Sequence, residues 1–128
     1  MLNDTILKNI TLEDKSNLCE INNIIKQLNM DSFIRSLKEG VNTIIDERNF
    51  NISGGEKQKI AIIRALLKHP EVLFFDEPTS ALDKASKKSF IKMIERFKNN
   101  SIIIIVTHDN DFLEISNHII DLDNYENI

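Results

Sequence analysis

The chain has 128 residues, of which 41% are hydrophobic and 28% charged, with a formal net charge of -4. This length suits one domain with a modest core, and the negative charge argues against a nucleic-acid binder, which usually needs a basic face. The longest purely apolar run, Ile102–Val106, is far too short to span a bilayer, and the first residues are not typical of a secretory signal.

The first half of the sequence predicts helices and a loop. The first ten residues show no clear period, and residues 1–52 predict no strand. From Thr11 the pattern is that of an amphipathic helix, with apolar residues at three- and four-residue spacing. Asp31 is expected to cap a second, short helix that Gly40 ends, followed by a loop at 41–52. The single cysteine, Cys19, excludes an internal disulfide and is expected to be a reduced, half-buried helix residue in the cytosol.

The second half alternates helices and strands. Ser53, followed three residues later by Glu56, predicts a capping box at the start of a helix that stops before Pro70. Apolar runs at 72–75 and 101–106 are typical of buried parallel strands, with a helix at about 84–98 between them. A short helix at 111–115 and a last strand at 118–122 follow. This order predicts an α/β fold whose parallel strands are buried on both faces and joined by right-handed crossovers.

Titratable side chains follow both predicted strands. Asp76 and Glu77 come after the first strand, and His108 follows the second. Open parallel sheets bind ligands beyond the carboxyl ends of their strands. Two adjacent carboxylates can divide the work of phosphoryl transfer, one holding Mg²⁺ and the other deprotonating the attacking water. Taken singly, an acidic turn explains Asp76 and Glu77 equally well, and a turn or satisfied surface histidine explains His108 better than a catalytic role does.

The segment Ser53-Gly54-Gly55-Glu56 has its own chemistry. A helix N-terminus exposes unpaired N–H groups and a partial positive charge, which suit an anion. Two glycines remove the side chains that would hold a phosphate away, and the Ser53 hydroxyl can cap the helix or bond a phosphate oxygen. A plain capped helix after a glycine turn is the alternative.

Taken together and in this order, these segments resemble the ATP-binding cassette of ABC transporters over nearly the whole chain. Residues 52–58 resemble the signature motif, 72–77 Walker B with its catalytic glutamate, 80–83 the D-loop and His108 the switch histidine. The implied fold class is α/β, the C-terminal part of a P-loop NTPase parallel-sheet core. It follows an α-helical signature subdomain, and the N-terminal strands and Walker A are missing. We divide the chain into a helical subdomain with an X-loop-like segment (1–52) and the signature helix with the C-terminal half of the core (53–128).

The resemblance implies ATP and Mg²⁺ as cofactors and assigns roles to the residues at the strand ends. Asp76 would hold Mg²⁺, Glu77 would be the general base, and His108 would read the γ-phosphate.

A second group of residues would act across a cassette dimer. Ser53, Gly54 and Gly55 would contact the γ-phosphate of ATP bound to the opposite cassette, and Asp83 would help couple the two sites. Glu56 stands where the family more often has glutamine. It adds negative charge near a triphosphate, although it also fits the capping box.

Two further segments resemble exporter-type cassettes. Residues 2–10 resemble the stretch that follows the Q-loop, and 43–49 resemble the X-loop, which touches the coupling helices of the membrane domain. Asp46 and Asn49 stand where the X-loop usually has glycine, and a plain surface loop is the alternative. The implied partners are a second cassette and a transmembrane domain, with no nucleic acid, at the cytoplasmic face of the membrane.

The sequence contains no G-x-x-x-x-G-K-[ST] motif, since its three glycines are Gly40, Gly54 and Gly55. Without that loop there is no cradle for the α- and β-phosphates, so we expect the isolated chain to be inactive. A sheet without its N-terminal strands would also leave the chain poorly stable or prone to associate. Met1 is then either an internal methionine of a longer transporter or the start of a short product that pairs with a separate Walker A half.

Three functions follow from these observations. The leading one is the ATP-hydrolysing part of an ABC exporter, which supplies the signature motif and Glu77 to a composite ATP site. A DNA-repair or chromosome-maintenance ATPase carries the same motifs, but it places a coiled coil before the signature, and no sustained heptads occur here. A catalytically inactive interaction module is favoured by the missing phosphate loop and opposed by the intact Glu77 and His108.

Overall fold

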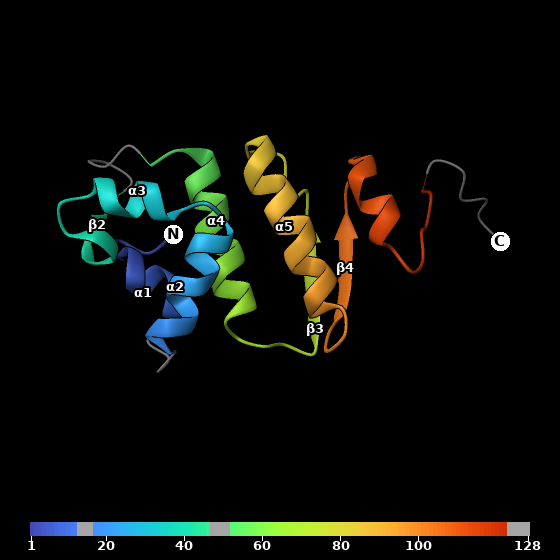
Figure 1. Cartoon of the computed structure of the whole chain (residues 1–128), viewed down its shortest axis with the longest axis horizontal. Coiled ribbons are helices and arrows are strands. Elements are labelled where there is room, and N and C mark those ends of the chain that lie inside the picture. Colours follow the sequence, from blue (N-terminus) through green and yellow to red (C-terminus); the bar gives the residue numbers. More distant parts are fainter. Residues whose placement is uncertain (13–16, 47–51, 123–128) are drawn as a thin grey trace.

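The computed structural model describes residues 1–12, 17–46 and 52–122. Small helices and a short antiparallel pair of strands lie on one side of the long helix α4, while α5 and a two-stranded sheet lie on the other (Figure 1). The elements are β1 (Asp4–Thr5), α1 (Ile6–Thr11), α2 (Leu18–Gln27), α3 (Asp31–Ser36), η1 (Gly40–Asn42), β2 (Ile44–Ile45), α4 (Gly54–Leu66), β3 (Val72–Asp76), α5 (Lys84–Phe97), β4 (Ile102–Val106) and η2 (Asn110–Ile115).

The sheet consists of β3 and β4, which confirm the predicted parallel pair. The two strands are in register from Val72 opposite Ile102 to Asp76 opposite Val106, so they end together. Helix α5 crosses between them and covers one face. There the ring of Phe90 meets Phe75 edge-on, with the ring centroids 5.4 Å apart. This contact attaches the crossover helix to the sheet.

The other face of the sheet is exposed. The side chain of Phe74 is 64% exposed, whereas that of its neighbour Phe75 is 8% exposed. Val72 and alternate residues of β4 are exposed on the same face. The prediction that both strands are buried on both faces is therefore wrong. In the described ranges, helices cover the sheet from the α5 side alone.

The predicted last strand at 118–122 is also absent. Residues 116–122 have no regular structure, and Ile119, Ile120 and Leu122 are exposed. A strand needs a neighbour to pair with its backbone N–H and C=O groups, and the strand pairs of the described chain, β1 with β2 and β3 with β4, do not include this segment. The helix predicted at 111–115 is present as the 3-10 helix η2, whose Phe112 is buried against Phe90.

The N-terminal half contains elements that the sequence did not predict. β1 and β2 pair antiparallel, with Asp4 opposite Ile45 and Thr5 opposite Ile44. The prediction of no strand before Ser53 is therefore wrong, because strands of two residues are too short to produce a period. Helix α1 follows directly, since the Thr5 hydroxyl caps it by accepting from the Lys8 N–H.

Helix α2 confirms the predicted amphipathic helix but begins at Leu18 and not at Thr11, which is the last residue of α1. Ile21, Ile24 and Ile25 are buried, and the Asn17 side chain caps the helix by accepting from the Cys19 N–H. Cys19 itself is exposed, so its predicted half-burial is wrong. It lies in the first turn, outside the apolar stripe.

Helix α3 differs from its prediction at both ends. Its N-cap is Met30, which makes no side-chain cap bond, while Asp31 is the first helical residue. The helix ends at Ser36 and not at Gly40. Gly40 begins the 3-10 helix η1 with φ +54°, a left-handed conformation that suits glycine. The structure therefore has two separate features, the end of α3 at Ser36 and the 3-10 helix that begins at Gly40, where the sequence predicted a single helix end.

Helix α4 is the centre of the molecule. Ile60, Ile63 and Leu66 are fully buried in a core that draws residues from α1, α2, β3 and α5 alike. The Arg64 guanidinium donates from Nε to the Asn9 carbonyl oxygen at 2.6 Å and so attaches α1 to α4. Among the described residues, no helix combines the length and apolarity that a membrane span requires.

Candidate functional site

The ends of β3 and β4 bring Glu77 and His108 together. The register of the parallel strands places Asp76 opposite Val106, so the residues that follow the two strands lie at the same edge of the sheet. Oε1 of Glu77 accepts from the His108 backbone N–H at 3.1 Å and lies 2.8 Å from the ring Nδ1 of His108. Sequence placed Glu77 and His108 after two different strands, and the structure adds that the two side chains are in contact.

The backbone of Glu77 has an uncommon conformation. Its φ is +44°, in the left-handed region, which costs a residue with a Cβ roughly 1–2 kcal/mol. Its N–H donates to the Val106 carbonyl oxygen at 2.9 Å, and its own carbonyl accepts from the Gln58 Nε2 and from Ser80. This set of bonds offsets the strain and directs the side chain toward His108.

Asp76 is the last residue of β3, and its side chain is exposed. The described residues contain no group of three or more His, Cys, Asp or Glu side chains that could hold a metal ion. Mg²⁺ commonly uses one or two carboxylates and takes its other ligands from phosphate oxygens and water. A single exposed carboxylate fits this use of Mg²⁺, and it does not fit a site made from protein ligands alone.

The start of α4 confirms the predicted capping box. The Ser53 hydroxyl accepts from the Glu56 backbone N–H at 3.2 Å, and a Glu56 carboxylate oxygen accepts from the Ser53 backbone N–H at 2.8 Å. The Ser53 hydroxyl also donates to that oxygen at 2.8 Å. Glu56 therefore has a definite structural role: its carboxylate engages the hydroxyl and the backbone N–H of Ser53, the N-cap residue.

The two glycines of α4 differ in their surroundings. A Cβ on Gly55 would lie 2.6 Å from the Ala81 carbonyl oxygen, closer than any real contact, while a Cβ on Gly54 would meet the Ala81 side chain at 3.9 Å. Gly55 is therefore required by the close approach of the turn after β3. The start of α4 is therefore in direct contact with the turn at Ala81.

Asp83 caps α5 within its own chain. Its carboxylate accepts from the Ser86 hydroxyl at 2.6 Å and from the Ser86 N–H at 2.9 Å, and Lys59 lies 3.4 Å away. The hydrogen bonds from the Ser86 side chain and backbone, with the charge of Lys59, hold the pKa of Asp83 well below its usual range. Asp83 is thus the N-cap of α5, a role that was not predicted from sequence.

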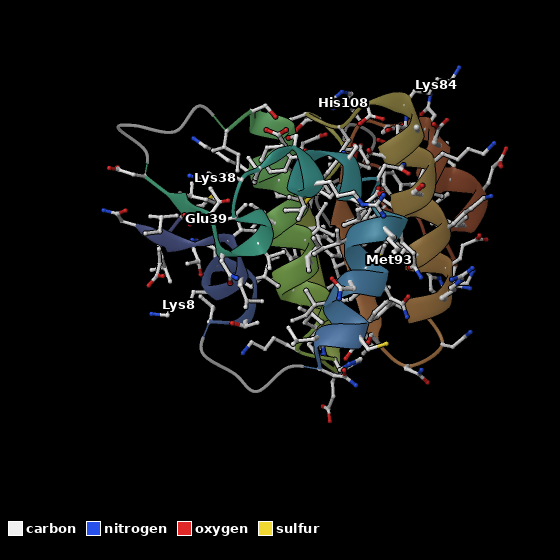
Figure 2. All side chains as sticks on the ribbon, turned by 60° about the vertical axis from the view of Figure 1, so that its left-hand side comes forward. Lys8, Lys38, Glu39, Lys84, Met93 and His108 are labelled. Atoms are coloured by element: carbon white, nitrogen blue, oxygen red, sulfur yellow. The ribbon has the colours of Figure 1, made fainter. Side chains whose placement is uncertain are left out.

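An open pocket of about 490 Å³ lies beside the carboxylate of Glu77. It is lined by Glu77, Thr79, Ser80, Leu82, Lys87, His108, Asp109 and Asn110. Figure 2 shows His108 at the same end of the molecule as Lys84, the first residue of α5. The pocket is therefore bounded by the turn after β3, the start of α5 and the segment after β4.

One wall of this pocket contains an ionic cluster that sequence reasoning missed. The Lys87 ammonium lies 2.6 Å from Asp109 and 2.7 Å from Asp111, and the Thr79 hydroxyl donates to Asp109 at 3.1 Å. The hydrogen bonds with Lys87 lower the pKa of Asp109, and those with both aspartates raise the pKa of Lys87. Lys87 lies on α5 and Asp109 follows β4, and no sequence pattern indicates that two residues so far apart form an ion pair.

The remaining site predictions fall partly outside the described residues. Of the X-loop-like segment 43–49, the structure describes Thr43 to Asp46, where β2 lies, and Asn49 is outside the description. Gln58 and Thr107 were not assigned roles from sequence, yet both contact Glu77. Gln58 belongs to the segment 52–58 that resembles the signature motif, and this was the feature of the sequence that could have pointed to it.

Comparison with known proteins identifies the family. The family model described as ABC transporter matches residues 2–80. The alpha-hemolysin translocation ATP-binding protein of Escherichia coli O157:H7 is 40% identical over 125 residues, which are 97% of this chain and 18% of the relative. ABC transporter B family member 14 of Arabidopsis thaliana is 42% identical over 105 residues, 81% of this chain and 8% of the relative.

A solved structure supports the same assignment. A bacterial Atm1-family ABC exporter with ATP bound superposes with a TM-score of 0.78 at 33% identity, over 88% of this chain and 20% of that chain. This chain spans about a fifth of the length of the first of these relatives and of that exporter. The α/β fold expected of a partial P-loop NTPase core is confirmed, and the exporter interpretation is supported over the DNA-repair alternative. The chain belongs to the ABC transporter family, within its ATP-binding cassette.

Proposed function

We propose that this chain supplies the signature helix and the catalytic carboxylate to a composite ATP site of an ABC exporter. The observation that supports this most directly is the contact between Glu77 Oε1 and His108 Nδ1, 2.8 Å apart at the ends of neighbouring parallel strands. This is the edge of a parallel sheet at which ligands bind. The identities of the relatives, a translocation protein and an exporter, agree with it.

Glu77 is the proposed general base. Its Oε1 receives both the backbone N–H and the ring of His108, whereas its Oε2 has a longer contact, 3.4 Å, from the Thr107 hydroxyl. Oε2 is therefore the oxygen that we assign to the attacking water. It orients the water and takes its proton, a contribution of about 10²–10⁴-fold in comparable enzymes.

His108 is the proposed sensor of the γ-phosphate. Its side chain is 88% exposed, and its Nδ1 is engaged by Glu77. When both ring nitrogens carry a proton, Nδ1 donates to Glu77 and Nε2 is available to donate to a phosphate oxygen. The histidine then connects the phosphate to the base that acts beside it.

Asp76 is the proposed contact for Mg²⁺, which when bound neutralises charge that develops on the transferred phosphoryl group. The exposed carboxylate at the end of β3 is next to the proposed base and holds the ion directly or through water.

The start of α4 is the proposed contact for ATP held by the opposite cassette. Gly54 and Gly55 present backbone N–H groups with no side chain in the way, and α4 begins there with its partial positive charge. The Ser53 hydroxyl donates to Glu56 in this structure, so it must turn away from Glu56 to donate to a phosphate. Asp83, in the turn that abuts this helix, is the proposed coupling residue.

The partners we propose are a second cassette and a transmembrane domain, at the cytoplasmic face of the membrane. We further propose that the isolated chain does not hydrolyse ATP, because its sequence has no G-x-x-x-x-G-K-[ST] to hold the α- and β-phosphates. The division at residue 52 into a helical subdomain and a catalytic half remains part of this proposal.

The test is reconstitution. The chain is mixed with a purified N-terminal half of an ABC exporter cassette that carries the phosphate loop, and phosphate release is measured. We expect ATP hydrolysis by the mixture and by neither half alone, with a loss of about 100-fold or more on Glu77→Gln. Hydrolysis that survives Glu77→Gln contradicts the assignment of the base.

The inactive interaction module is retained as a second candidate because the phosphate loop does not occur in this sequence. It makes the opposite prediction in a parallel assay. Added to a complete, active cassette, the chain then inhibits hydrolysis in proportion to its concentration, and Glu77→Gln inhibits equally well. Rescue of the N-terminal half argues against this candidate.

A further inference from the structure

The side-chain amide of Gln58 joins helix α4 to the turn that carries Glu77. Its Nε2 donates to the Glu77 carbonyl oxygen at 2.9 Å, and its Oε1 accepts from the Ala81 backbone N–H at 3.1 Å. Its Nε2 also lies 3.4 Å from the Ser80 hydroxyl. One planar amide therefore holds both ends of the turn at 77–81, using its donor and its acceptor together.

The Glu77 carbonyl requires an anchor from outside its own turn. The Ser80 N–H and hydroxyl donate to it at 3.2 and 3.0 Å, but Ser80 belongs to the turn and moves with it. The Glu77 N–H is anchored on β4 by the Val106 carbonyl. Within the described chain, Gln58 is the group that anchors the carbonyl side of this left-handed residue on another element.

The direction of the Glu77 side chain depends on these anchors. Its backbone conformation, with φ at +44°, places the carboxylate against the N–H and ring of His108. A residue with a Cβ relaxes from this region unless its surroundings hold it there. If the bond from Gln58 is lost, the Glu77 carbonyl keeps only its bonds from Ser80, within the same turn, and we expect the turn to shift and the carboxylate to leave His108.

We propose that Gln58 is a positioning residue for Glu77, holding its backbone so that the carboxylate stays against His108. Gln58 does so from the helix whose first residues are Gly54 and Gly55, and α4 begins at the end of the molecule where β3 and β4 stop (Figure 1). The proposed phosphate contact and the base of one chain are thereby joined through a single amide. The catalytic consequence rests on the function proposed above for Glu77.

The first experiment uses the 128-residue chain alone and does not depend on hydrolysis. Gln58→Met keeps the length of the side chain and removes both hydrogen bonds. Gln58→Glu keeps an acceptor for the Ala81 N–H but places a carboxylate oxygen where the donor to Glu77 was. Gln27→Met, on the exposed side of α2, is the matched control.

The readouts are the ¹⁵N shifts of the His108 ring and the exchange rate of the Ala81 amide. In the wild-type chain we expect Glu77→Gln to change the ring shifts, because it changes the partner of Nδ1. In the Gln58→Met background that change is largely lost, and Ala81 exchanges about tenfold faster or more. Gln58→Glu loses the ring response but keeps the Ala81 protection, and Gln27→Met alters neither readout. If Glu77→Gln shifts the ring equally in the Gln58→Met and wild-type backgrounds, the inference is overturned.

The second experiment separates this inference from the proposed function, using the reconstituted mixture. We expect Gln58→Met to lower kcat by about 10- to 100-fold with little change in the KM for ATP, because a displaced base affects the chemical step and not nucleotide binding. If Glu77→Gln abolishes hydrolysis and Gln58→Met leaves it intact, the positioning role is wrong and the proposed function stands. If the ring response is lost and neither variant lowers hydrolysis, the positioning holds and the catalytic role of Glu77 is wrong.

Discussion

Gly55 lies against the Ala81 carbonyl so closely that a Cβ on Gly55 would be 2.6 Å from the oxygen. The contact joins the second residue of α4 to the turn between β3 and α5. Since both partners are backbone, neither can move aside as a flexible side chain would.

Gly55→Ala is therefore expected to destabilise the chain by about 1–3 kcal/mol, because the turn at 77–81 must shift to admit the methyl group. Gly54→Ala is the matched control. Its Cβ meets Ala81 at an ordinary 3.9 Å, so the change is between neutral and about 1 kcal/mol stabilising, through helix propensity. Urea unfolding of the two variants measures the difference. Equal effects at both positions would show that the close approach has no energetic weight.

The adjacent residues Phe74 and Phe75 form a second matched pair. Phe75→Ala is expected to cost about 3–5 kcal/mol, since it empties the space against Phe90. Phe74→Ala is expected to cost much less and to reduce self-association, because it removes exposed apolar surface. Unfolding curves and sedimentation velocity check both statements. Unchanged association in Phe74→Ala would mean that this face of the sheet does not drive it.

The cap of α5 predicts a dependence of stability on pH. The pKa of Asp83 is lowered, first by its hydrogen bonds with Ser86, so ionised Asp83 stabilises the fold above the pKa of an unfolded aspartate. This stabilisation is lost progressively as the pH falls below about 4. Asp83→Asn keeps a side chain that can cap but removes the charge, so its free energy of unfolding should fall less steeply with acid.

The measurement is urea unfolding of the wild type and Asp83→Asn between pH 7 and pH 3. Glu114→Gln, an exposed carboxylate on η2, controls for the change in net charge. A wild-type acid slope retained in Asp83→Asn would show that other carboxylates account for the loss of stability.

The cluster around Lys87 predicts a difference between neighbouring lysines. Lys87→Met breaks the contacts with Asp109 and Asp111 and leaves two acids facing each other beside His108. We expect a lower urea midpoint and a rise in the pKa of Asp109, because its main lowering contact is gone. Lys88→Met, one residue along on an exposed position, removes the same charge and should change neither. Identical midpoints for the two variants would contradict the role of the cluster.

Most of the correct sequence predictions rest on patterns among residues that are close together in the chain. Ser53 and Glu56 are three residues apart, so the capping box depends on a single helix turn and can be recognised from two letters. The parallel pair and its crossover helix were recognisable because apolar runs and helical periods extend over many residues. The placement of Glu77 and His108 after successive strands could also be predicted, because ligand-binding groups of a parallel sheet lie beyond the carboxyl ends of its strands. Their direct contact was not predicted.

Contacts between distant residues could not be predicted in this way. Gln58 and Glu77 are 19 positions apart and lie on different elements, and no spacing signals that an amide will meet a backbone carbonyl. The strand at 118–122 was predicted wrongly because an apolar run does not show whether a neighbouring strand is present. The two-residue strands β1 and β2 were missed because so short a pair has no period.

The sequence by itself therefore determined the order of the elements from α4 to η2, the capping box of α4 and which chemical groups follow each strand, since these depend on residues near one another in the chain. The tertiary structure alone decided the left-handed backbone of Glu77, the close contact of Gly55 with Ala81, and which face of the sheet is covered. The physical reason is that each of these features depends on a contact between elements that are far apart in the sequence. The free energy of a packed contact or a buried hydrogen bond depends on a partner that local sequence does not identify.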